Sequence, residues 1–180
     1  MKNRKNITIL KTAVGSLPSM SFINELKRNN VTVIGVDSDP NSIGFNFCNK
    51  SYVVPKANQK TYLKKIIEIC NKEKPDVILP SIEEEIIKLS KNRKIFEEKK
   101  ILVFTPEFKI SKICADKLQT REKFLAHMIP TYRIFSNQIH FPCIIKPQFG
   151  RGGKDVFKVN NPEELKFYRK KIKKPIITEF

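Results

Sequence analysis

Short runs of consecutive apolar residues alternate with longer helix-like segments along the first hundred residues of the sequence. Apolar residues recur at helical spacing at 22–29 and 61–70, and a polar helical segment covers 83–98. Continuous apolar runs are typical of strands buried on both faces, and strand–helix alternation builds right-handed βαβ units with parallel strands. The sequence therefore predicts an α/β fold over residues 1–107, a small doubly wound, Rossmann-like parallel sheet. Its strands are expected at 7–10, 31–36, 52–55, 76–80 and 101–104.

The pattern changes after Pro106. A single helix is expected at 110–128, and strands then follow each other closely, with one helix at 162–173 among them. Three glycines between two of these strands favour an antiparallel hairpin. We therefore expect a second domain, of the α+β class, over residues 108–180. Its strands are expected at 131–135, 143–146, 156–159 and 176–179.

The sequence is basic, with a formal net charge of +17. Residues 1–107 have a net charge of +7 and residues 108–180 of +10, so the shorter part carries the larger excess, as a site for a phosphorylated small molecule would. Lys, Asn and Ile are abundant throughout, so much of the charge is compositional. A basic nucleic-acid-binding protein is one alternative. However, no basic stripe with interleaved aromatic residues and no zinc or helix-turn-helix pattern occurs, so we expect no nucleic-acid partner.

The cysteines and the apolar runs bound the location of the chain. Cys48, Cys70, Cys114 and Cys143 are far apart and lack the spacing of a metal site, which is typical of reduced thiols. No run approaches the length of a membrane span. The basic residues at 1–5 precede only four apolar-rich residues, too few for a signal peptide. We therefore expect a cytoplasmic chain with no membrane partner.

The first glycine turn follows the first predicted strand. Gly15 and Ser16 lie there, and Asp37 follows 22 residues later, near the spacing at which an acid binds ribose in dinucleotide folds. Leu17 and Pro18 stand where that fingerprint needs glycines, so NAD binding is not supported. A tight turn with a serine helix cap is the favoured interpretation.

The second glycine loop, at 144–156, carries more information. A buried strand delivers Lys146, and Gly150, Gly152 and Gly153 then let the loop expose its backbone N–H groups to an anion. The GxxxxGK[ST] pattern of a Walker loop is absent, and a strand rather than a helix follows. An ordinary hairpin with surface basic residues is the alternative, but the loop favours phosphate binding.

This loop resembles the glycine-rich loop of ATP-grasp enzymes. Residues 116–130, which begin Asp-Lys and end Met-Ile-Pro, are similar to the segment that opens the family's first ATP-binding subdomain, with His127-Met128 in place of its glycine. The first domain resembles the pre-ATP-grasp domain, and within the family the chain resembles the large subunit of carbamoyl phosphate synthetase and its stand-alone relatives. The resemblance implies binding of ATP by Lys117, Lys146, Gly150, Gly152, Gly153, Glu179 and Phe180, the last two at the adenine hinge.

The resemblance also implies a reaction. ATP phosphorylates a small carboxylate substrate, and an amine or similar nucleophile displaces phosphate from the acyl phosphate. Gly15, Ser16 and Asp37 are candidates for holding the acceptor, and no catalytic residue is assigned. The family's Mg²⁺ ligands belong to a second subdomain that would follow Phe180, so no metal ligand is expected in residues 1–180. The acidic run 83–85 is interpreted as a solvated helix start.

These features lead to three hypotheses. The first is the N-terminal portion of an ATP-grasp ligase that is incomplete and inactive by itself, either a fragment or a truncated product. The second is a non-catalytic module that binds a small molecule or a partner through a vestigial nucleotide site, and the third is the nucleic-acid-binding protein. Without the second subdomain, an apolar edge at Ile176 and Ile177 would be exposed, which predicts self-association into a homo-oligomer.

Overall fold

The computed structural model describes residues 6–135 and 138–180, and the chain divides into two compact units, the first ending at Ser111 and the second beginning at Lys112. The basic residues at 1–5 lie outside the described part of the chain. No helix of the described residues is long and apolar enough to cross a membrane. Each unit is described by itself.

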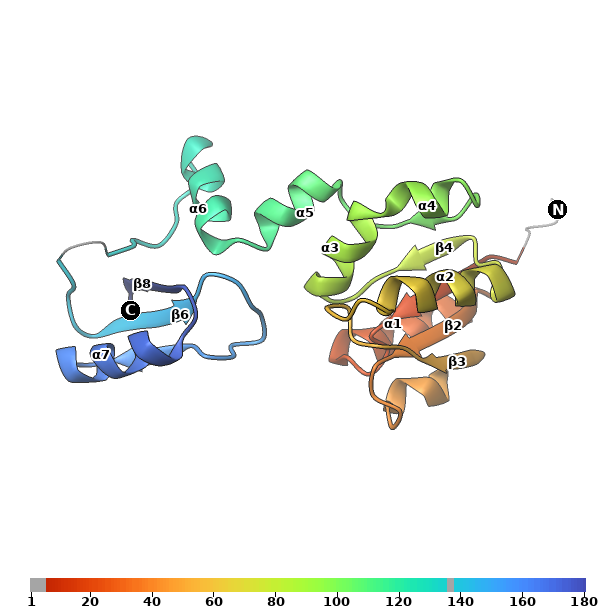
Figure 1. Ribbon diagram of the computed structural model, residues 1–180, viewed down its shortest axis with the longest axis horizontal. Coiled ribbons are helices and arrows are strands. Elements are labelled where there is room, and N and C mark those ends of the chain that lie inside the picture. The colour runs from red at the N-terminus through yellow and green to blue at the C-terminus, as the bar shows by residue number, and fades with distance from the viewer. Residues whose placement is uncertain (1–5, 136–137) are drawn as a thin grey trace. The chain divides into compact units, whose positions relative to one another are not determined.

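The first unit contains a parallel sheet flanked by helices (Figure 1). The strand order is β3-β2-β1-β4-β5, so the chain winds outward in both directions from the boundary between β1 and β4. In this order the switch point lies at the carboxyl ends of β1 and β4. The predicted doubly wound α/β fold is therefore confirmed. Its elements are β1 (Thr8–Thr12), α1 (Leu17–Arg28), β2 (Thr32–Asp37), the 3-10 helix η1 (Ile43–Phe47), β3 (Lys50–Val53), α2 (Tyr62–Glu73), β4 (Val77–Leu79), α3 (Glu83–Lys91), α4 (Arg93–Glu97) and β5 (Leu102–Val103).

Both faces of this sheet are covered. Leu10 and Ile34 pair in register and join a core cluster with residues of α2, α3 and α4. Val33, one position away, points to the opposite face and packs with Val14 and with Ile23 of α1. Successive strand residues face opposite sides, so a strand with helices on both sides must be apolar at nearly every position. This explains the continuous apolar runs of the sequence.

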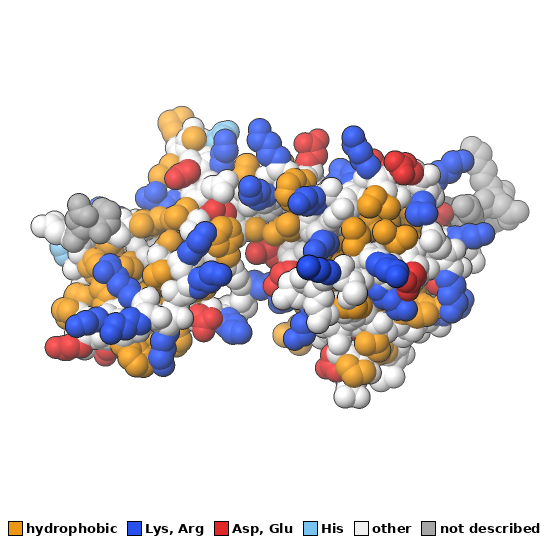
Figure 2. Space-filling view, viewed as in Figure 1, with side chains coloured by type: hydrophobic (Ala, Val, Ile, Leu, Met, Phe, Trp, Pro, Cys, Tyr) orange, Lys and Arg blue, Asp and Glu red, His pale blue; other side chains and the backbone are white. Residues whose placement is uncertain are grey.

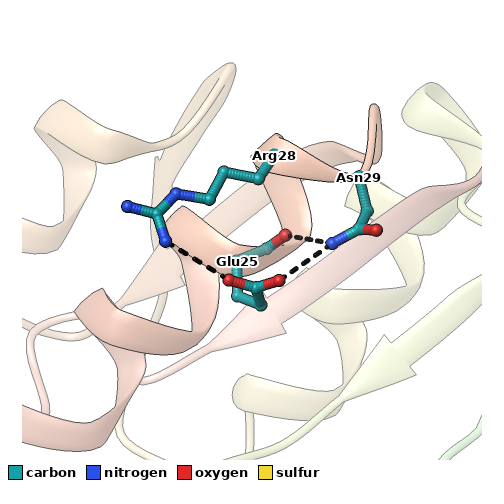
Figure 3. Close-up of polar contacts among 3 residues, drawn as sticks. All are labelled: Glu25, Arg28 and Asn29. Atoms are coloured by element: carbon teal, nitrogen blue, oxygen red, sulfur yellow. Dashed lines mark hydrogen bonds and ion pairs between the residues drawn. The ribbon is translucent and has the colours of Figure 1, made fainter.

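The end of α1 shows a local contact cluster on the surface (Figure 3). Asn29 donates its side-chain amide to the Glu25 carbonyl and carboxylate, at 2.9 and 3.1 Å, and Arg28 lies 3.5 Å from the same carboxylate. Asn30 then takes a positive φ of 58°, which breaks the helix. Exposed ion pairs of this kind contribute little to stability, so the cluster marks the helix end.

The second unit is α+β, as predicted. It contains a three-stranded antiparallel sheet in the order β7-β6-β8, and α7 packs on it. The single helix expected at 110–128 is wrong, because the chain breaks at Asp116, whose φ and ψ of −105° and 107° are extended. The strand expected at 131–135 is also wrong, since only one bridge forms there, from Ile134 to Thr178. The elements are α5 (Phe108–Cys114), which crosses the boundary between the units, α6 (Lys117–Ala126), β6 (Cys143–Pro147), β7 (Phe157–Val159), α7 (Pro162–Lys171) and β8 (Pro175–Glu179).

The expectation of an exposed apolar edge is wrong as well. Ile176 and Ile177 are each only 6% exposed. The backbone of residues 133–135 lies along the free side of β8, where the N–H of Phe135 donates to the Ile177 carbonyl at 2.9 Å. The edge of β8 is therefore covered by the unit's own chain, and the apolar-edge argument for self-association does not hold.

Candidate functional site

A pocket of about 300 Å³ lies within the second unit. Three cations line it, Lys117 and Arg121 from α6 and Lys146 from β6, and no carboxylate is among its lining residues in the described chain. Tyr132, Thr120 and Phe124 complete much of the wall. The structure thus brings together the two lysines singled out in the sequence, 29 residues apart. It adds Arg121 and Tyr132, which sequence reasoning missed.

Asp116 places Lys117 at the first position of α6. Its carboxylate accepts hydrogen bonds from the backbone N–H groups of Leu118 and Gln119, at 2.9 and 3.3 Å, and so caps the helix. The side-chain amide of Gln148, just after β6, donates to both oxygens of the same carboxylate at 2.9 Å. Burial alone would raise the pKa of Asp116, but these hydrogen bonds outweigh it and hold that pKa below its usual value.

Lys117 is also joined to the glycine loop. Its backbone N–H donates to the Gln148 carbonyl at 3.2 Å, and its ammonium donates to the Gly150 carbonyl at 2.7 Å. The Asp-Lys pair that opens α6 therefore fixes the start of the glycine loop from two directions. Two motifs separated by about thirty residues in the sequence form one structure.

Lys146 is half-buried on β6 and its ammonium lies over the Tyr132 ring, 4.0 Å from the ring centroid. Desolvation by burial, and then repulsion by Lys117, lowers the pKa of Lys146. A ring face stabilises an ammonium less than an anion does, and no carboxylate is among the described residues that line this pocket. The ammonium is therefore suited to meet a negatively charged ligand.

The glycine loop requires its glycines for conformational reasons. Gly150, Gly152 and Gly153 have φ values of 124°, 65° and 71°, a region that other residues rarely adopt. A Cβ at Gly152 or Gly153 would meet no atom within 4 Å, so these two glycines serve backbone shape and not packing. A turn of this kind can expose successive backbone N–H groups that bind an anion.

The last two predicted nucleotide contacts lie at the end of β8. The Glu179 carboxylate accepts a hydrogen bond from the Arg133 N–H at 2.8 Å, and the Phe180 ring faces the ammonium of Lys158 at 4.2 Å. Neither residue lines the pocket that Lys117 and Lys146 share. Their assignment to the adenine stays a prediction.

The acceptor candidates of the first unit lie together at the carboxyl edge of its sheet. The Asp37 carboxylate accepts from the Gly15 N–H at 2.8 Å, from the Ser42 hydroxyl at 3.2 Å and from the Asp39 N–H at 3.0 Å. A Cβ at Gly15 would lie 2.6 Å from the Ser42 hydroxyl, so this glycine is required for close packing. Asp37 therefore organises its own loops, whereas Ser16 is half-exposed beside them.

A buried polar network at the switch point was missed by sequence reasoning. Lys11, at the end of β1, is only 3% exposed, and its ammonium donates to the Thr12 carbonyl at 3.3 Å and to the Ser81 hydroxyl. The Thr12 hydroxyl in turn donates to the carboxylate of Glu85, in the first turn of α3. Glu85 is 4% exposed, so the interpretation of 83–85 as a solvated helix start is wrong for this residue. A lysine–threonine pair ending an apolar strand was the available signal.

Burial shifts both charged groups of this network toward neutrality. It lowers the pKa of Lys11 from 10.5 to about 8, although Glu85 opposes the shift, and it raises the pKa of Glu85 to about 6. Ser81 also contacts Ser19 at 3.1 Å, and Ser19 contacts the half-exposed Ser16 at 2.8 Å. The hydroxyls thus connect the buried lysine to the surface at the acceptor candidates.

The described residues contain no group of three or more His, Cys, Asp or Glu side chains arranged to hold a metal ion. The cysteines Cys48, Cys70, Cys114 and Cys143 are all free thiols.

Comparison with known proteins identifies similar chains. The sequence is 30% identical over 150 residues to the formate-dependent phosphoribosylglycinamide formyltransferase of Wigglesworthia glossinidia brevipalpis, which covers 79% of this chain and 37% of that protein. It is 24% identical over 176 residues to the enzyme of the same name from Ignicoccus hospitalis. That alignment covers 87% of this chain and 42% of the relative. The chain thus spans well under half the length of these curated relatives.

Solved structures share the fold. An L-amino acid ligase from Bacillus licheniformis superimposes with a TM-score of 0.74 at 16% identity, over 100% of this chain and 45% of that one. N5-carboxyaminoimidazole synthetase from Staphylococcus aureus, complexed with ADP, gives the same TM-score and identity over 99% and 49%. These likenesses confirm the expected fold, a parallel α/β sheet unit followed by a unit with an antiparallel sheet. The family model described as "PylC-like, N-terminal domain" matches residues 12–104, more than half of the sequence, and the chain therefore belongs to the PylC-like family.

Proposed function

We propose that this chain is the N-terminal portion of an ATP-dependent carboxylate–amine ligase and that the cationic pocket of its second unit binds the phosphates of ATP. The observation that carries the proposal is the convergence of Lys117, Arg121 and Lys146 on one pocket with no carboxylate among its lining residues. In support, the curated relatives are named as formate-dependent enzymes, and formate is a carboxylate. One solved structure of the same fold is a complex with ADP.

The described residues fit a nucleoside triphosphate. Burial and then repulsion by Lys117 lower the pKa of Lys146, and a polyanion bound beside these lysines would offset both unfavourable effects. The glycines at 150, 152 and 153 give the loop a turn conformation, in which backbone N–H groups can cradle phosphate oxygens. Glu179 and Phe180 are proposed to meet the adenine.

ATP, when bound, supplies the phosphoryl group that activates a carboxylate as an acyl phosphate. Lys117 and Lys146 act as compact charges that hold and orient the phosphates. Asp116 keeps Lys117 in place through the helix cap, and the glycine loop covers the phosphates and excludes water. Gly15 and Ser16, with Asp37 organising their loop, are proposed to hold the acceptor substrate in the first unit. The domain limits proposed for these two roles are 1–107 and 108–180.

The finer assignment to a carbamoyl phosphate synthetase-like reaction belongs to the same proposal. Mg²⁺ is proposed to act with ATP in the complete enzyme, held by residues beyond those described. Over the face visible in Figure 2, Lys and Arg side chains are scattered among acidic and apolar ones across both units. Such scattering favours a local anion site over a continuous nucleic-acid track.

Binding of ATP by the whole chain tests the proposal. Isothermal titration with ATP and Mg²⁺ is expected to show one site, and Lys146→Ala or Lys117→Ala should weaken it at least tenfold, because each removes a charge–phosphate contact. Lys170→Ala, at an exposed lysine of α7, is the matched control and should change nothing. Equal affinity of the wild type and Lys146→Ala would refute the pocket assignment. Binding of random single-stranded DNA that falls steeply with salt and survives both pocket variants would favour the nucleic-acid alternative.

A further inference from the structure

Tyr132 contacts the cationic groups of Lys146 and Arg121 and the backbone of Lys117. Its ring lies under the Lys146 ammonium at 4.0 Å, and its hydroxyl donates to the Lys117 carbonyl at 3.3 Å. Its own carbonyl accepts a hydrogen bond from the Nε of Arg121 at 2.8 Å. One residue thus contacts a cation of β6 and two residues of α6 through three different groups.

The backbone holds Tyr132 firmly in this place. Two residues later Ile134 bridges to Thr178 of β8, and the neighbouring Arg133 exchanges hydrogen bonds with Glu179 through its N–H and its carbonyl. The Tyr132 side chain is half-buried in the pocket wall. The backbone next to Tyr132 is therefore anchored to β8, although residues 131–135 form no strand.

The cationic side chains of the pocket need contacts that hold them in place. Lysine and arginine side chains are long and flexible, and like charges in one pocket repel each other, so without an opposing contact they would turn outward to water. A ring face attracts an ammonium without neutralising it, unlike a carboxylate, so the cation stays available to a ligand. Groups already held in the binding arrangement lose less freedom when the ligand arrives.

We propose that Tyr132 is a positioning residue that holds the Lys146 ammonium, the Arg121 guanidinium and the backbone of Lys117 in an anion-binding arrangement before the ligand binds. The identity of the ligand rests on the proposed function, whereas the arrangement of the side chains around Tyr132 does not. Arg121 then becomes a third cation of the phosphate site. Its Nε donates to the Tyr132 carbonyl, and its two Nη groups would contact the phosphates. The ligand class that fits is a polyphosphate.

Two variants separate the ring from the hydroxyl. Tyr132→Phe keeps the ring under Lys146, so its affinity for inorganic triphosphate should stay within about threefold of the wild type. Tyr132→Leu removes the ring face and should weaken binding about five- to thirty-fold. Tyr52→Leu is the matched control, because Lys72 lies 5.1 Å from the Tyr52 ring in the first unit, and affinity should not change.

Nuclear magnetic resonance of the full chain without ligand gives a second readout that a general loss of structure would not mimic. The Lys146 ε-methylene resonances should be shifted upfield by the ring in the wild type and in Tyr132→Phe, and should lose that shift in Tyr132→Leu while other resonances of β6 stay. Unshifted wild-type resonances, or triphosphate affinity unchanged in Tyr132→Leu, would overturn the inference. If the wild type shows the ring shift but binds no triphosphate, the proposed function fails and the positioning role stands.

Discussion

Replacing Lys11 with methionine should stabilise the first unit, although it deletes two hydrogen bonds. Methionine has nearly the same length without the charge, and the position is only 3% exposed. Ser81 would keep its contact with Ser19 at 3.1 Å, so the loss of the ammonium leaves no isolated hydroxyl there. The substitution therefore isolates the free energy of holding a charge in this buried network.

The size of the effect follows from the pKa of Lys11. A decrease from 10.5 to about 8 means that folding disfavours the charged form by about 3 kcal/mol. Part of this is offset, because Lys11 also lowers the pKa of Glu85, whose carboxylate would be harder to ionise without it. We expect Lys11→Met to raise the free energy of unfolding by about 1 to 3 kcal/mol at pH 7.

The pH dependence of the stability difference between Lys11→Met and the wild type is a second, independent check. Below pH 8 the lysine is protonated in both the folded and the unfolded chain, so the penalty is complete and constant. Between pH 8 and 10.5 the folded chain releases a proton that the unfolded chain keeps, and the stability of the wild type therefore rises relative to the variant. The advantage of Lys11→Met should shrink steadily over this range.

Two buried cysteines make the measurement specific to each unit. Cys70 lies in the core of the first unit and Cys143 in that of the second, at 1% and 0% exposure. Brief thiol labelling across a urea series, read by mass spectrometry, gives one unfolding transition for each. The Cys70 midpoint should increase in Lys11→Met and stay unchanged in Lys64→Met, an exposed lysine of α2, and the Cys143 midpoint should stay unchanged in both. A lower Cys70 midpoint at pH 7, or a gain independent of pH, would refute the reasoning.

Further predictions concern the second unit. Asp116→Ala removes the cap of α6 and the partner of Gln148, and should lower the Cys143 midpoint by the equivalent of about 1 to 2 kcal/mol, with Asp116→Asn affected less. Met128 takes a φ of 54° just after α6 while 92% exposed, so Met128→Gly should raise the same midpoint by up to about 1 kcal/mol, and a decrease would contradict this. Because the pKa of Lys146 is lowered, triphosphate affinity should begin to fall with rising pH at a lower pH than for an ordinary lysine, and titrations from pH 7 to 10 in the wild type, but not in Lys146→Ala, should show this fall.

The parts of the fold that could be predicted are those determined by local pattern. The runs around Leu10 and Ile34 are apolar because both faces of the sheet are covered, and this requirement leaves a clear trace in the sequence. The break at Asp116 left a weaker trace, because a capping aspartate inside a continuous helical pattern looks like an exposed helix residue. Residues 131–135 look like a strand but bond mainly to the edge of β8, a pairing set by the tertiary fold.

The charged residues of the candidate site could be predicted from the sequence, but the residue that positions them could not. Lys146 and the three glycines form a contiguous motif, and Lys117 belongs to a second motif of its own. Tyr132 belongs to neither motif, and its three contacts arise only when α6, β6 and β8 pack together. Residues that act by holding other residues carry no local pattern, which is why sequence reasoning passed over this one.

The two units treat a lysine at the carboxyl end of a strand in different ways, and the difference bears on which one can bind a ligand. Lys146 is half-buried over a ring and keeps donor capacity for an incoming anion. Lys11 is buried, and its ammonium already donates to the Thr12 carbonyl and the Ser81 hydroxyl. A ligand that bound this ammonium would have to replace these protein hydrogen bonds. The half-exposed hydroxyl of Ser16 is therefore the group that we propose for binding at the first sheet, and the hydroxyls of Ser19 and Ser81 connect it to Lys11.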